Sequence, residues 1–387
     1  MKVLITGAGG FVGKNLVLRL REICSGHDSV HTSLYIDEVM EWTRATPENI
    51  WHEYCGRADF VFHLAGVNRP EDSGDYEREN VGFTATLLNA LKSAANPPPV
   101  MLASSIHAAE NGGGAYGASK RRAERLTEEY GRETGAQVMI YRLCNLFGKW
   151  SRPEYNSVVA TFCQRISRGL PIRVDDSEKK LELLYIDDLM EELLRALEGR
   201  PSRDQAGYCY APGSVYRTLG EIAALLTAFS RQPETLMLPD MPEGSFEKKL
   251  YATYLSYLPM ARAACPLVVH RDSRGSFTEL LKNRRCGQVS VNRAEPGVTR
   301  GQHYHNSKWE IFVVLSGLGM IRQRKLGEEA ITEIAVSGEN PTAVYMLPGY
   351  THELTNLSST EPLLTLIWAS EIFDPQRPDT YWQEVTL

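Results

Sequence analysis

The chain opens with the stretch Met1-Lys-Val-Leu-Ile-Thr6-Gly7-Ala-Gly-Gly10-Phe-Val-Gly13, which decides the fold of its first half. Residues 3–5 form a short apolar run that is typical of a buried parallel strand. Glycines follow at a spacing of three residues, and a helix is expected from Lys14 onward. Glycines in such a turn allow the backbone to approach a pyrophosphate, and the helix N-terminus attracts that anion. Because the motif lies between a strand and a helix, the sequence predicts a doubly wound α/β unit that binds a dinucleotide.

The choice between NADH and NADPH depends on the strand that follows the first helix. A strand at 34–36 followed by Asp37 favours NADH, whereas a strand at 38–43 followed by Arg44 places a guanidinium where a 2′-phosphate would lie. We prefer Arg44 and expect NADPH, although the sequence leaves both alternatives open. The residues predicted to contact the cofactor are Gly7, Gly10, Phe11, Val12, Gly13, Arg44, Leu64, Ala65 and Lys120.

Composition limits the classes of function. With 387 residues, 43% of them apolar, the chain can bury two cores. The net charge is −6 and charges of both signs are interspersed, so the sequence has no cluster of basic residues of the kind that binds nucleic acid. The seven cysteines form no Cys-x-x-Cys pair, which suits a reducing cytoplasm. No signal peptide precedes the first strand and no apolar run could span a bilayer, so we expect a cytoplasmic protein without membrane or nucleic-acid partners.

A hydroxyl, a phenol and an ammonium are expected to meet at one edge of the sheet. The strand predicted over 100–105 ends in Ser104-Ser105, and Tyr116-Gly-Ala-Ser-Lys120 follows. The four-residue spacing puts Tyr116 and Lys120 on one helix face. A lysine beside a phenol lowers the phenol's pKa and prepares it to exchange a proton with a carbonyl oxygen, which Ser105 can hold. A lone Tyr-x-x-x-Lys is usually structural, but after a dinucleotide turn the catalytic interpretation is favoured.

Residues 1 to about 240 resemble the extended short-chain dehydrogenase/reductases that act on nucleotide sugars. The motifs that carry the resemblance are Thr6 to Gly13, His63-Leu-Ala-Gly66, Asn80, Ser104-Ser105, Tyr116 with Lys120, Arg142-Leu-Cys-Asn145-Leu-Phe-Gly148 and Tyr185-Ile-Asp-Asp188. The resemblance implies a Rossmann fold, hydride transfer with NAD(P), and catalytic roles for Ser105, Tyr116 and Lys120. The chain departs from the family in a short spacing from Ser105 to Tyr116, and in Glu182, where many members carry arginine.

Four residues of this first part are predicted to bind substrate: Asn68, Arg69, Asn145 and Asn156. Asn68 and Arg69 lie in a loop at the carboxyl edge of the sheet, where ligands bind in open α/β folds. Asn145 belongs to the family motif, and Asn156 lies where family members touch the diphosphate. The alternative for Asn156 is that it caps a helix beginning at Ser157.

A change in the sequence pattern after the first 240 residues indicates a second domain. Pro233 to Gly244 is rich in proline and glycine and reads as a boundary, and 246–258 as a connecting helix. After Pro266, short β-type runs alternate with turns, which favours an all-β barrel or jelly roll. The predicted strands are 288–292, 310–315, 318–322, 342–347 and 363–368. We predict domains at 1–243 and 263–387, joined by a linker at 244–262.

Within the second domain lie the two motifs of the cupin family, Gly297-x5-His303-Tyr-His305-x4-Glu310-x6-Gly317 and Pro348-Gly349-Tyr-Thr-His352-x3-Asn356. Histidines two apart on a strand face the same way. His303, His305, Glu310 and His352 together offer an N3O donor set that suits zinc or another divalent ion. The sequence therefore predicts a metal site inside the barrel.

Asp272-Ser-Arg-Gly-Ser-Phe-Thr-Glu279, Gln288-Val-Ser-Val and Gly297 to His303 also resemble the deoxysugar-nucleotide 3,5-epimerases. That resemblance implies that Arg274 and Glu279 contact the nucleotide and that His303 is the catalytic base. A zinc-bound His303 has no free lone pair for that task. Either Tyr304, Lys308 or a metal-bound water moves the proton, or the metal is adventitious.

From end to end, the chain resembles the two-domain CapF-type enzymes of capsule and O-antigen synthesis. Further motifs contribute: Phe246-Glu-Lys-Lys-Leu-Tyr251, Gly275 to Glu279, and Phe373-Asp-Pro375 with Pro378-Asp-Thr-Tyr381. The resemblance implies a homodimer with zinc that epimerises C3 of a UDP-4-keto-6-deoxy-N-acetylhexosamine and reduces C4 with NADPH. The implied product is UDP-2-acetamido-2,6-dideoxy-L-talose, on the route to UDP-N-acetyl-L-fucosamine.

The residues alone indicate only a keto-sugar reductase fused to a cupin. Two alternatives are a single-step reductase whose barrel is a scaffold, and a non-catalytic NADPH-sensing module. Arg274, Glu279 and the His/Glu set weigh against a mere scaffold, and Tyr116 weighs against a sensor.

Overall fold

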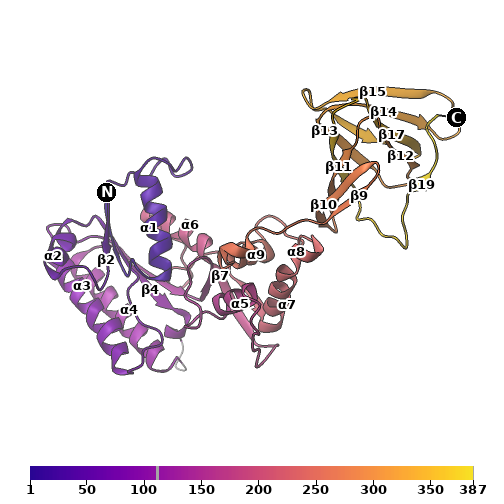
Figure 1. Cartoon of the computed structure of the whole chain (residues 1–387). Coiled ribbons are helices and arrows are strands. Elements are labelled where there is room, and N and C mark those ends of the chain that lie inside the picture. The colour runs from indigo at the N-terminus through magenta and orange to yellow at the C-terminus, as the bar shows by residue number, and fades with distance from the viewer. Residues whose placement is uncertain (110–112, 387) are drawn as a thin grey trace. The chain divides into compact units, whose positions relative to one another are not determined.

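The computed structural model describes residues 1–109 and 113–386. The chain forms two compact units (Figure 1), one made of Met1–Leu226 with Gly244–Leu258, the other of Thr227–Glu243 with Pro259 to the end of the described chain. Residues 244–258 thus pack with the first unit and residues 227–243 with the second. The predicted domains, 1–243 and 263–387 with a linker at 244–262, differ from this division in where residues 227–243 and 244–258 belong.

The first unit is built on a parallel sheet with the strand order β2-β1-β3-β4-β5. Its strands are β1 (Lys2–Thr6), β2 (Glu38–Trp42), β3 (Phe60–His63), β4 (Val100–Ser105) and β5 (Val138–Leu143). Because β1 is followed in sequence by strands on both of its sides, a crevice is expected at its carboxyl end. This sheet confirms the predicted doubly wound fold.

Side chains of the strands alternate between two cores. Val3 and Ile5 pack with α1 (Phe11–Cys24) and α6 (Ile186–Leu197) on one face. Leu4 packs with α2 (Glu48–Arg57) and α3 (Phe83–Lys92) on the other. Both faces of the central strand are therefore covered, which explains its continuous apolar run.

Several predicted boundaries shift. Helix α1 begins at Phe11, not at Lys14, because Gly10 is already the N-cap in an extended conformation. The second strand lies at Glu38–Trp42, the preferred of the two alternatives. Asn80 lies in a π-helical turn, η1 (Tyr76–Gly82), which continues into α3.

The rest of the first unit places the catalytic helix and a small second sheet. Its elements are η2 (Ile106–Ala108), α4 (Gly114–Thr134), β6 (Asn145–Phe147), α5 (Val158–Ser167), β7 (Lys180–Tyr185), β8 (Val215–Thr218), α9 (Phe246–Ser256) and the larger part of α7 (Leu219–Ser230), which crosses into the second unit after Leu226. Strands β6, β7 and β8 form the small sheet. The side chain of Ser157, not Asn156, caps α5 by accepting from the Ala160 N–H, so the capping alternative for Asn156 is wrong.

The second unit is a pair of antiparallel sheets, which confirms the predicted all-β barrel class. The sheets run in the orders β16-β13-β18-β11-β10-β9 and β15-β14-β17-β12-β19. The elements are α8 (Gln232–Thr235), η3 (Met260–Arg262), β9 (Val269–Asp272), β10 (Gly275–Asn283), β11 (Gly287–Ala294), β12 (Thr299–Tyr304), β13 (Glu310–Ser316), β14 (Leu318–Lys325), β15 (Ile331–Ser337), β16 (Ala343–Met346), β17 (Tyr350–Asn356), β18 (Leu363–Ala369) and β19 (Tyr381–Trp382).

Apolar side chains of both sheets meet in one core, with Phe312 and Met346 from one sheet and Ile321 and Leu354 from the other. Alternate residues of each strand point into it, as the pleat of a strand requires. Among the helices that the structure describes, none is long and apolar enough to cross a bilayer.

Candidate active and metal sites

The glycine turn after β1 is packed so tightly that two of its glycines cannot be replaced. A Cβ at Gly7, whose φ is +74°, would lie 2.7 Å from the backbone nitrogen of Ala65. A Cβ at Gly13 would lie 2.2 Å from the carbonyl oxygen of Gly7. The turn and the first turn of α1, with Phe11 and Val12, are thereby held against the segment that follows β3. The predicted cofactor residues of the turn are thus brought together with Ala65.

The two candidates for cofactor choice lie at different ends of the sheet. Asp37 precedes β2 and pairs with the N-terminal amine of Met1 at 2.6 Å, so it lies where β1 begins. Arg44 follows the carboxyl end of β2; its side chain is 79% exposed, and its guanidinium lies 3.0 Å from the carboxylate of Glu79 in η1. The structure therefore does not support the NADH alternative built on Asp37. The binding of a 2′-phosphate by Arg44 stays a prediction.

Ser105, Tyr116 and Lys120, the three predicted catalytic residues, lie at the end of β4 and on α4. Ser105 ends β4, where its hydroxyl accepts from the His107 N–H at 3.2 Å, and it lies near enough to the half-buried phenol of Tyr116 on α4 to affect the pKa of that phenol. Lys120, one helical turn further on, is buried, and its Nζ donates to the Ala103 carbonyl at 2.9 Å. The residues between η2 and α4, where the spacing is short for the family, include 110–112, which lie outside the described residues.

Burial decides the pKa values of this group. Burial lowers the pKa of Lys120 to about 8, and a nearby carboxylate, Glu124, opposes the shift. The pKa of Tyr116 is raised, chiefly by burial, against the hydrogen bond from Ser105. The expectation that Lys120 lowers the phenol's pKa is therefore wrong for this structure, because desolvation of the phenolate dominates. A phenol that keeps its proton suits an acid that donates to a developing alkoxide.

Asn80 connects the loop after β3 to the catalytic helix. Its Oδ1 accepts from the Val67 N–H at 2.8 Å, and its Nδ2 donates to the Ser119 hydroxyl at 2.9 Å. A Cβ at Gly66 would lie 2.8 Å from the Asn80 Oδ1 and 3.2 Å from the Lys120 Nζ. The π-helical turn η1 positions this amide, in keeping with the frequent occurrence of such turns at functional sites.

Two aromatic neighbours of Tyr116 were missed by sequence reasoning. The ring of Tyr76 lies 5.9 Å from that of Tyr116, and the ring of His107 lies 6.2 Å from it. The Tyr76 hydroxyl donates to the Asn68 carbonyl at 3.1 Å. The available signal for Tyr76 was its position four residues before Asn80 on one helical face. His107 has no such signal, because it belongs to a short 3₁₀ turn.

The predicted substrate residues of the first unit are held in different ways. The Asn68 Oδ1 is buried without a hydrogen-bond partner among the described residues. Arg69 donates to the Tyr155 carbonyl at 3.2 Å, and Asn145 donates to the Glu182 carbonyl at 3.1 Å. Asn156 is exposed just before the start of α5. An amide oxygen without a hydrogen-bond partner, in the loop after β3, fits a ligand-binding role for Asn68. The substrate-binding roles of all four residues stay predictions.

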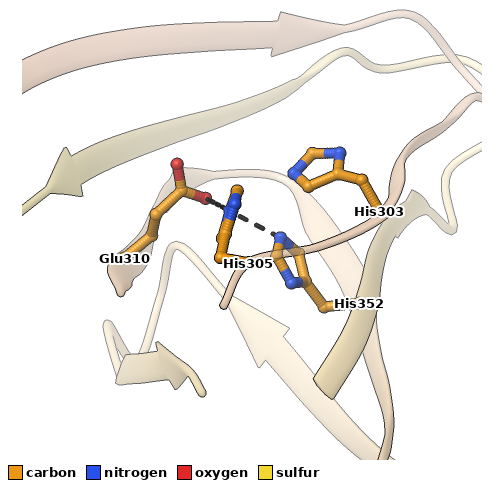
Figure 2. A group of neighbouring side chains, drawn as sticks. All are labelled: His303, His305, Glu310 and His352. Carbon is orange, nitrogen blue, oxygen red and sulfur yellow. Dashed lines mark ion pairs between the residues drawn. The ribbon is translucent and has the colours of Figure 1, made fainter. Parts of the chain in front are cut away.

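The four predicted metal ligands of the second unit lie together. His303 comes from β12, His305 directly follows it, Glu310 begins β13 and His352 lies in β17. Their candidate ligand atoms all lie within 4.8 Å of one another. Figure 2 shows a Glu310 oxygen facing the imidazoles of His305 and His352, at 3.5 and 3.7 Å. His305 and His352 are almost completely buried.

A bulge in β12 directs His303 to this group. The pairing of β12 with β17 slips between Gly301 and His303, and Gln302 has a φ of +60°, which is unfavourable for a residue with a side chain. A Cβ at Gly301 would lie 2.7 Å from the His352 carbonyl oxygen. After the bulge His303 lies opposite His352, with ring centroids 4.6 Å apart. Bulges of this kind re-aim side chains next to active sites.

The chemistry of this donor set fits a divalent metal. Burial, reinforced by His352, lowers the pKa of His303 to about 4, so its imidazole is neutral at pH 7. Burial alone would raise the pKa of Glu310, but the neighbouring imidazoles of His305 and His352 outweigh it and hold that pKa below its usual range. The Nε2 atoms of His305 and His352 are buried and have no hydrogen-bond partner among the described residues. Imidazole nitrogens without hydrogen-bond partners beside a carboxylate form a donor set that suits a divalent metal.

The two side chains of the second unit that are predicted to contact the nucleotide form ion pairs with neighbouring residues of the chain. Arg274, in the turn between β9 and β10, binds the carboxylate of Asp272 at 2.7 Å. Glu279 on β10 pairs with Lys282 at 2.8 Å and lines a cleft of about 240 Å³. Contact of either with a nucleotide stays a prediction.

Comparison with known proteins gives one family match for each half of the chain and several relatives that match the whole chain. Residues 3–207 match the NAD dependent epimerase/dehydratase family, and residues 270–381 match the polysaccharide biosynthesis C-terminal domain. The chain is 39% identical over 381 residues, 98% of each protein, to a Pseudomonas aeruginosa protein named UDP-2-acetamido-2,6-beta-L-arabino-hexul-4-ose reductase. The crystal structure of capsular polysaccharide assembling protein CapF from Staphylococcus aureus has a TM-score of 0.89 at 42% identity, covering 99% of this chain and 100% of that one. The chain belongs to the CapF-type family.

Membership of this family makes the protein a nicotinamide-dependent enzyme of the epimerase/dehydratase class. The first unit alone has many fold relatives. The Thermus thermophilus UDP-glucose 4-epimerase, solved with NAD, has a TM-score of 0.51 at 19% identity and covers 68% of this chain. That likeness shows the fold alone, whereas the CapF-type likeness extends over both units.

Proposed function

We propose that this CapF-type chain is a bifunctional nucleotide-sugar enzyme. The second unit epimerises C3 of a UDP-4-keto-6-deoxy-N-acetylhexosamine, and the first reduces the C4 ketone with NADPH to UDP-2-acetamido-2,6-dideoxy-L-talose. The observation that carries the proposal is the presence of two assembled sites in one chain: Ser105 with Tyr116 and Lys120, and the His/Glu cluster. The name of the Pseudomonas relative, a UDP-hexulose reductase, supports the substrate class.

Reduction requires a hydride at carbon and a proton at oxygen. Bound NADPH would supply the hydride for C4. Tyr116 donates its proton to the C4 oxygen, which Ser105 holds by a hydrogen bond. The ammonium of Lys120 stabilises the phenolate that remains. Reduction removes the activating carbonyl, so the stereochemistry at C3 is then locked.

Epimerisation must therefore precede reduction. The C3 proton is acidic because the electron pair left behind delocalises onto the C4 oxygen as an enolate, and return of a proton from the opposite face inverts C3. A divalent ion such as zinc, held by His303, His305, Glu310 and His352, would supply Lewis-acid stabilisation to an oxyanion. A coordinated His303 lacks the lone pair of a base, which leaves Tyr304 and Lys308 as side-chain candidates. Lys308 is buried, with its Nζ 3.9 Å from the Glu310 carboxylate.

Solvent deuterium exchange tests the proposal. The protein is incubated with the 4-keto sugar nucleotide in D2O without NADPH, and C3 is followed by NMR. We expect deuterium at C3 with the wild-type protein and none with His303→Ala. No exchange, together with NADPH oxidation on the unepimerised sugar, would reduce the second unit to a scaffold. Loss of both reactions would leave a sensing module.

The pH profile of reduction should report Lys120. Because burial lowers the pKa of Lys120 to about 8, its charge is present below that pH and is lost as the pH rises through it. We expect kcat/KM for reduction to decline between about pH 7 and about pH 9.5, since the neutral amine no longer stabilises the phenolate. Exchange at C3, measured at the same pH values, is the control for damage to the chain. A flat profile for reduction over this range would contradict a role for the Lys120 charge.

A further inference from the structure

The residues after the last long strand, β18, return to the metal-ligand cluster. Asp379 and Thr380 lie beside His305, from which they are separated by 74 and 75 positions in the sequence. The backbone carbonyl oxygen of Asp379 lies 2.6 Å from the His305 Nδ1 and accepts a hydrogen bond from it. The Thr380 hydroxyl lies 3.4 Å from the same nitrogen. A hydrogen bond at Nδ1 leaves the Nε2 lone pair of His305 free to face Glu310.

The carboxylate of Asp379 organises the loop that joins His305 to Glu310. It accepts from the backbone N–H groups of Asn306, Ser307 and Lys308 at 3.0, 2.9 and 2.9 Å. The Ser307 hydroxyl donates to it as well, at 3.1 Å. Hydrogen bonds to an ionised acceptor are stronger than neutral ones, so one side chain determines the path of this loop.

The same dipeptide also holds the buried ammonium of the cluster. Lys308 is 8% exposed, and its Nζ donates to the Thr380 hydroxyl at 3.0 Å. The Glu310 carboxylate lies 3.9 Å from this Nζ. Asp379 and Thr380 therefore contact one predicted metal ligand and the one buried lysine that flanks Glu310 among the described residues.

The C-terminal segment is itself anchored to the barrel. Strand β19 pairs with β12, placing Trp382 opposite His303 and Tyr381 opposite Tyr304. The guanidinium of Arg324 donates to the carbonyls of Val385 and Glu384 at 2.7 and 2.9 Å. Because strand β19 and residues 384–385 are both bound to the barrel, Asp379 and Thr380, which precede them, have a defined position relative to the histidines.

We propose that Asp379 and Thr380 are positioning residues of the metal site. The Asp379 carbonyl selects the His305 tautomer that presents Nε2 to the metal, its carboxylate holds residues 306–308, and Thr380 aims Lys308 at Glu310. The inference rests on the metal site of the proposed function. Outer partners of metal ligands are known to alter metal affinity by about 10- to 100-fold when removed.

The test is titration of the metal-free, full-length protein with zinc, and with cobalt as a spectroscopic probe. We expect Asp379→Ala to bind zinc about 10- to 100-fold more weakly than wild type and to change the cobalt absorption spectrum at saturation. Asp379→Asn keeps an accepting oxygen and is expected to lie between the two. Asp374→Asn is the matched control, since that carboxylate accepts from the Gln376 N–H within its own turn. Its affinity should stay within about twofold of wild type.

Thr380→Val probes the Lys308 contact with little change of shape. It is expected to leave zinc affinity within about twofold and to slow deuterium exchange at C3 about tenfold, because the ammonium is no longer aimed at Glu310. Unchanged exchange would overturn the role of Thr380. Wild-type zinc affinity and an unchanged cobalt spectrum in Asp379→Ala would overturn the role of the Asp379 carboxylate, which is the group that alanine removes. If Asp379→Ala does not fold, Asp379→Asn decides: an affinity within twofold of wild type overturns the role. A wild-type protein that binds neither metal refutes the metal site itself.

Discussion

Replacement of Tyr116 by phenylalanine is expected to lower the rate of NADPH-dependent reduction about a thousandfold. The phenol is the acidic side chain that lies beside Ser105, and its raised pKa keeps it protonated at neutral pH. Phenylalanine preserves the ring, which packs against Tyr76, and removes only the proton. Hydride transfer would then leave an alkoxide at C4 without a positioned acid.

The measurement is NADPH oxidation with the epimerised keto sugar, alongside deuterium exchange at C3. Exchange should continue at the wild-type rate in Tyr116→Phe, because the proposed function assigns that step to the other unit. Tyr130→Phe is the matched control: it makes the same change on the same helix, at a hydroxyl that donates to the Pro98 carbonyl outside the site. Full turnover by Tyr116→Phe would mean that another group donates the proton, and would favour the sensing alternative.

Replacement of Glu310 by glutamine is expected to weaken zinc binding at least about a hundredfold and to abolish C3 exchange. The glutamine has nearly the same shape but no charge, and its NH₂ group would face the His305 and His352 nitrogens in place of a carboxylate oxygen. Repulsion between that amide and a divalent cation adds to the loss of attraction. Reduction by the first unit of an already epimerised substrate should persist, because none of its catalytic residues changes.

Two measurements check this result. Isothermal titration with zinc gives the affinity, and thermal unfolding with and without a chelator gives the coupling to folding. A metal present at about 100 times its Kd stabilises a folded unit by about 2.7 kcal/mol, so chelation should lower the unfolding temperature of the wild type and not of Glu310→Gln. Glu328→Gln is the control, because that exposed side chain pairs with Lys325 away from the histidines. Wild-type exchange by a metal-free Glu310→Gln would show that the metal is adventitious and that epimerisation proceeds without it.

Sequence by itself determined the features whose signal is local. The apolar run at 3–5 and the glycine spacing up to Gly13 predict a strand, a turn and a helix, because backbone sterics and helix-end electrostatics act over a few residues. The four-residue interval from Tyr116 to Lys120 determined that both lie on one helix face. The two-residue interval from His303 to His305 likewise predicted two ligands of one site.

Tertiary structure alone decided the pKa values of the site residues, the exact bounds of the elements and the contacts between residues distant in the sequence. The pKa of Tyr116 is raised, contrary to the expectation from its lysine neighbour, because burial depends on what the rest of the fold places around it. The helix start at Phe11 and the bulge at Gln302 follow from packing and strand register, which leave no periodic trace in the sequence. Asp379 reaches His305 only because β19 returns along β12. Such contacts between distant residues carry no local pattern, since either residue alone is compatible with many neighbours.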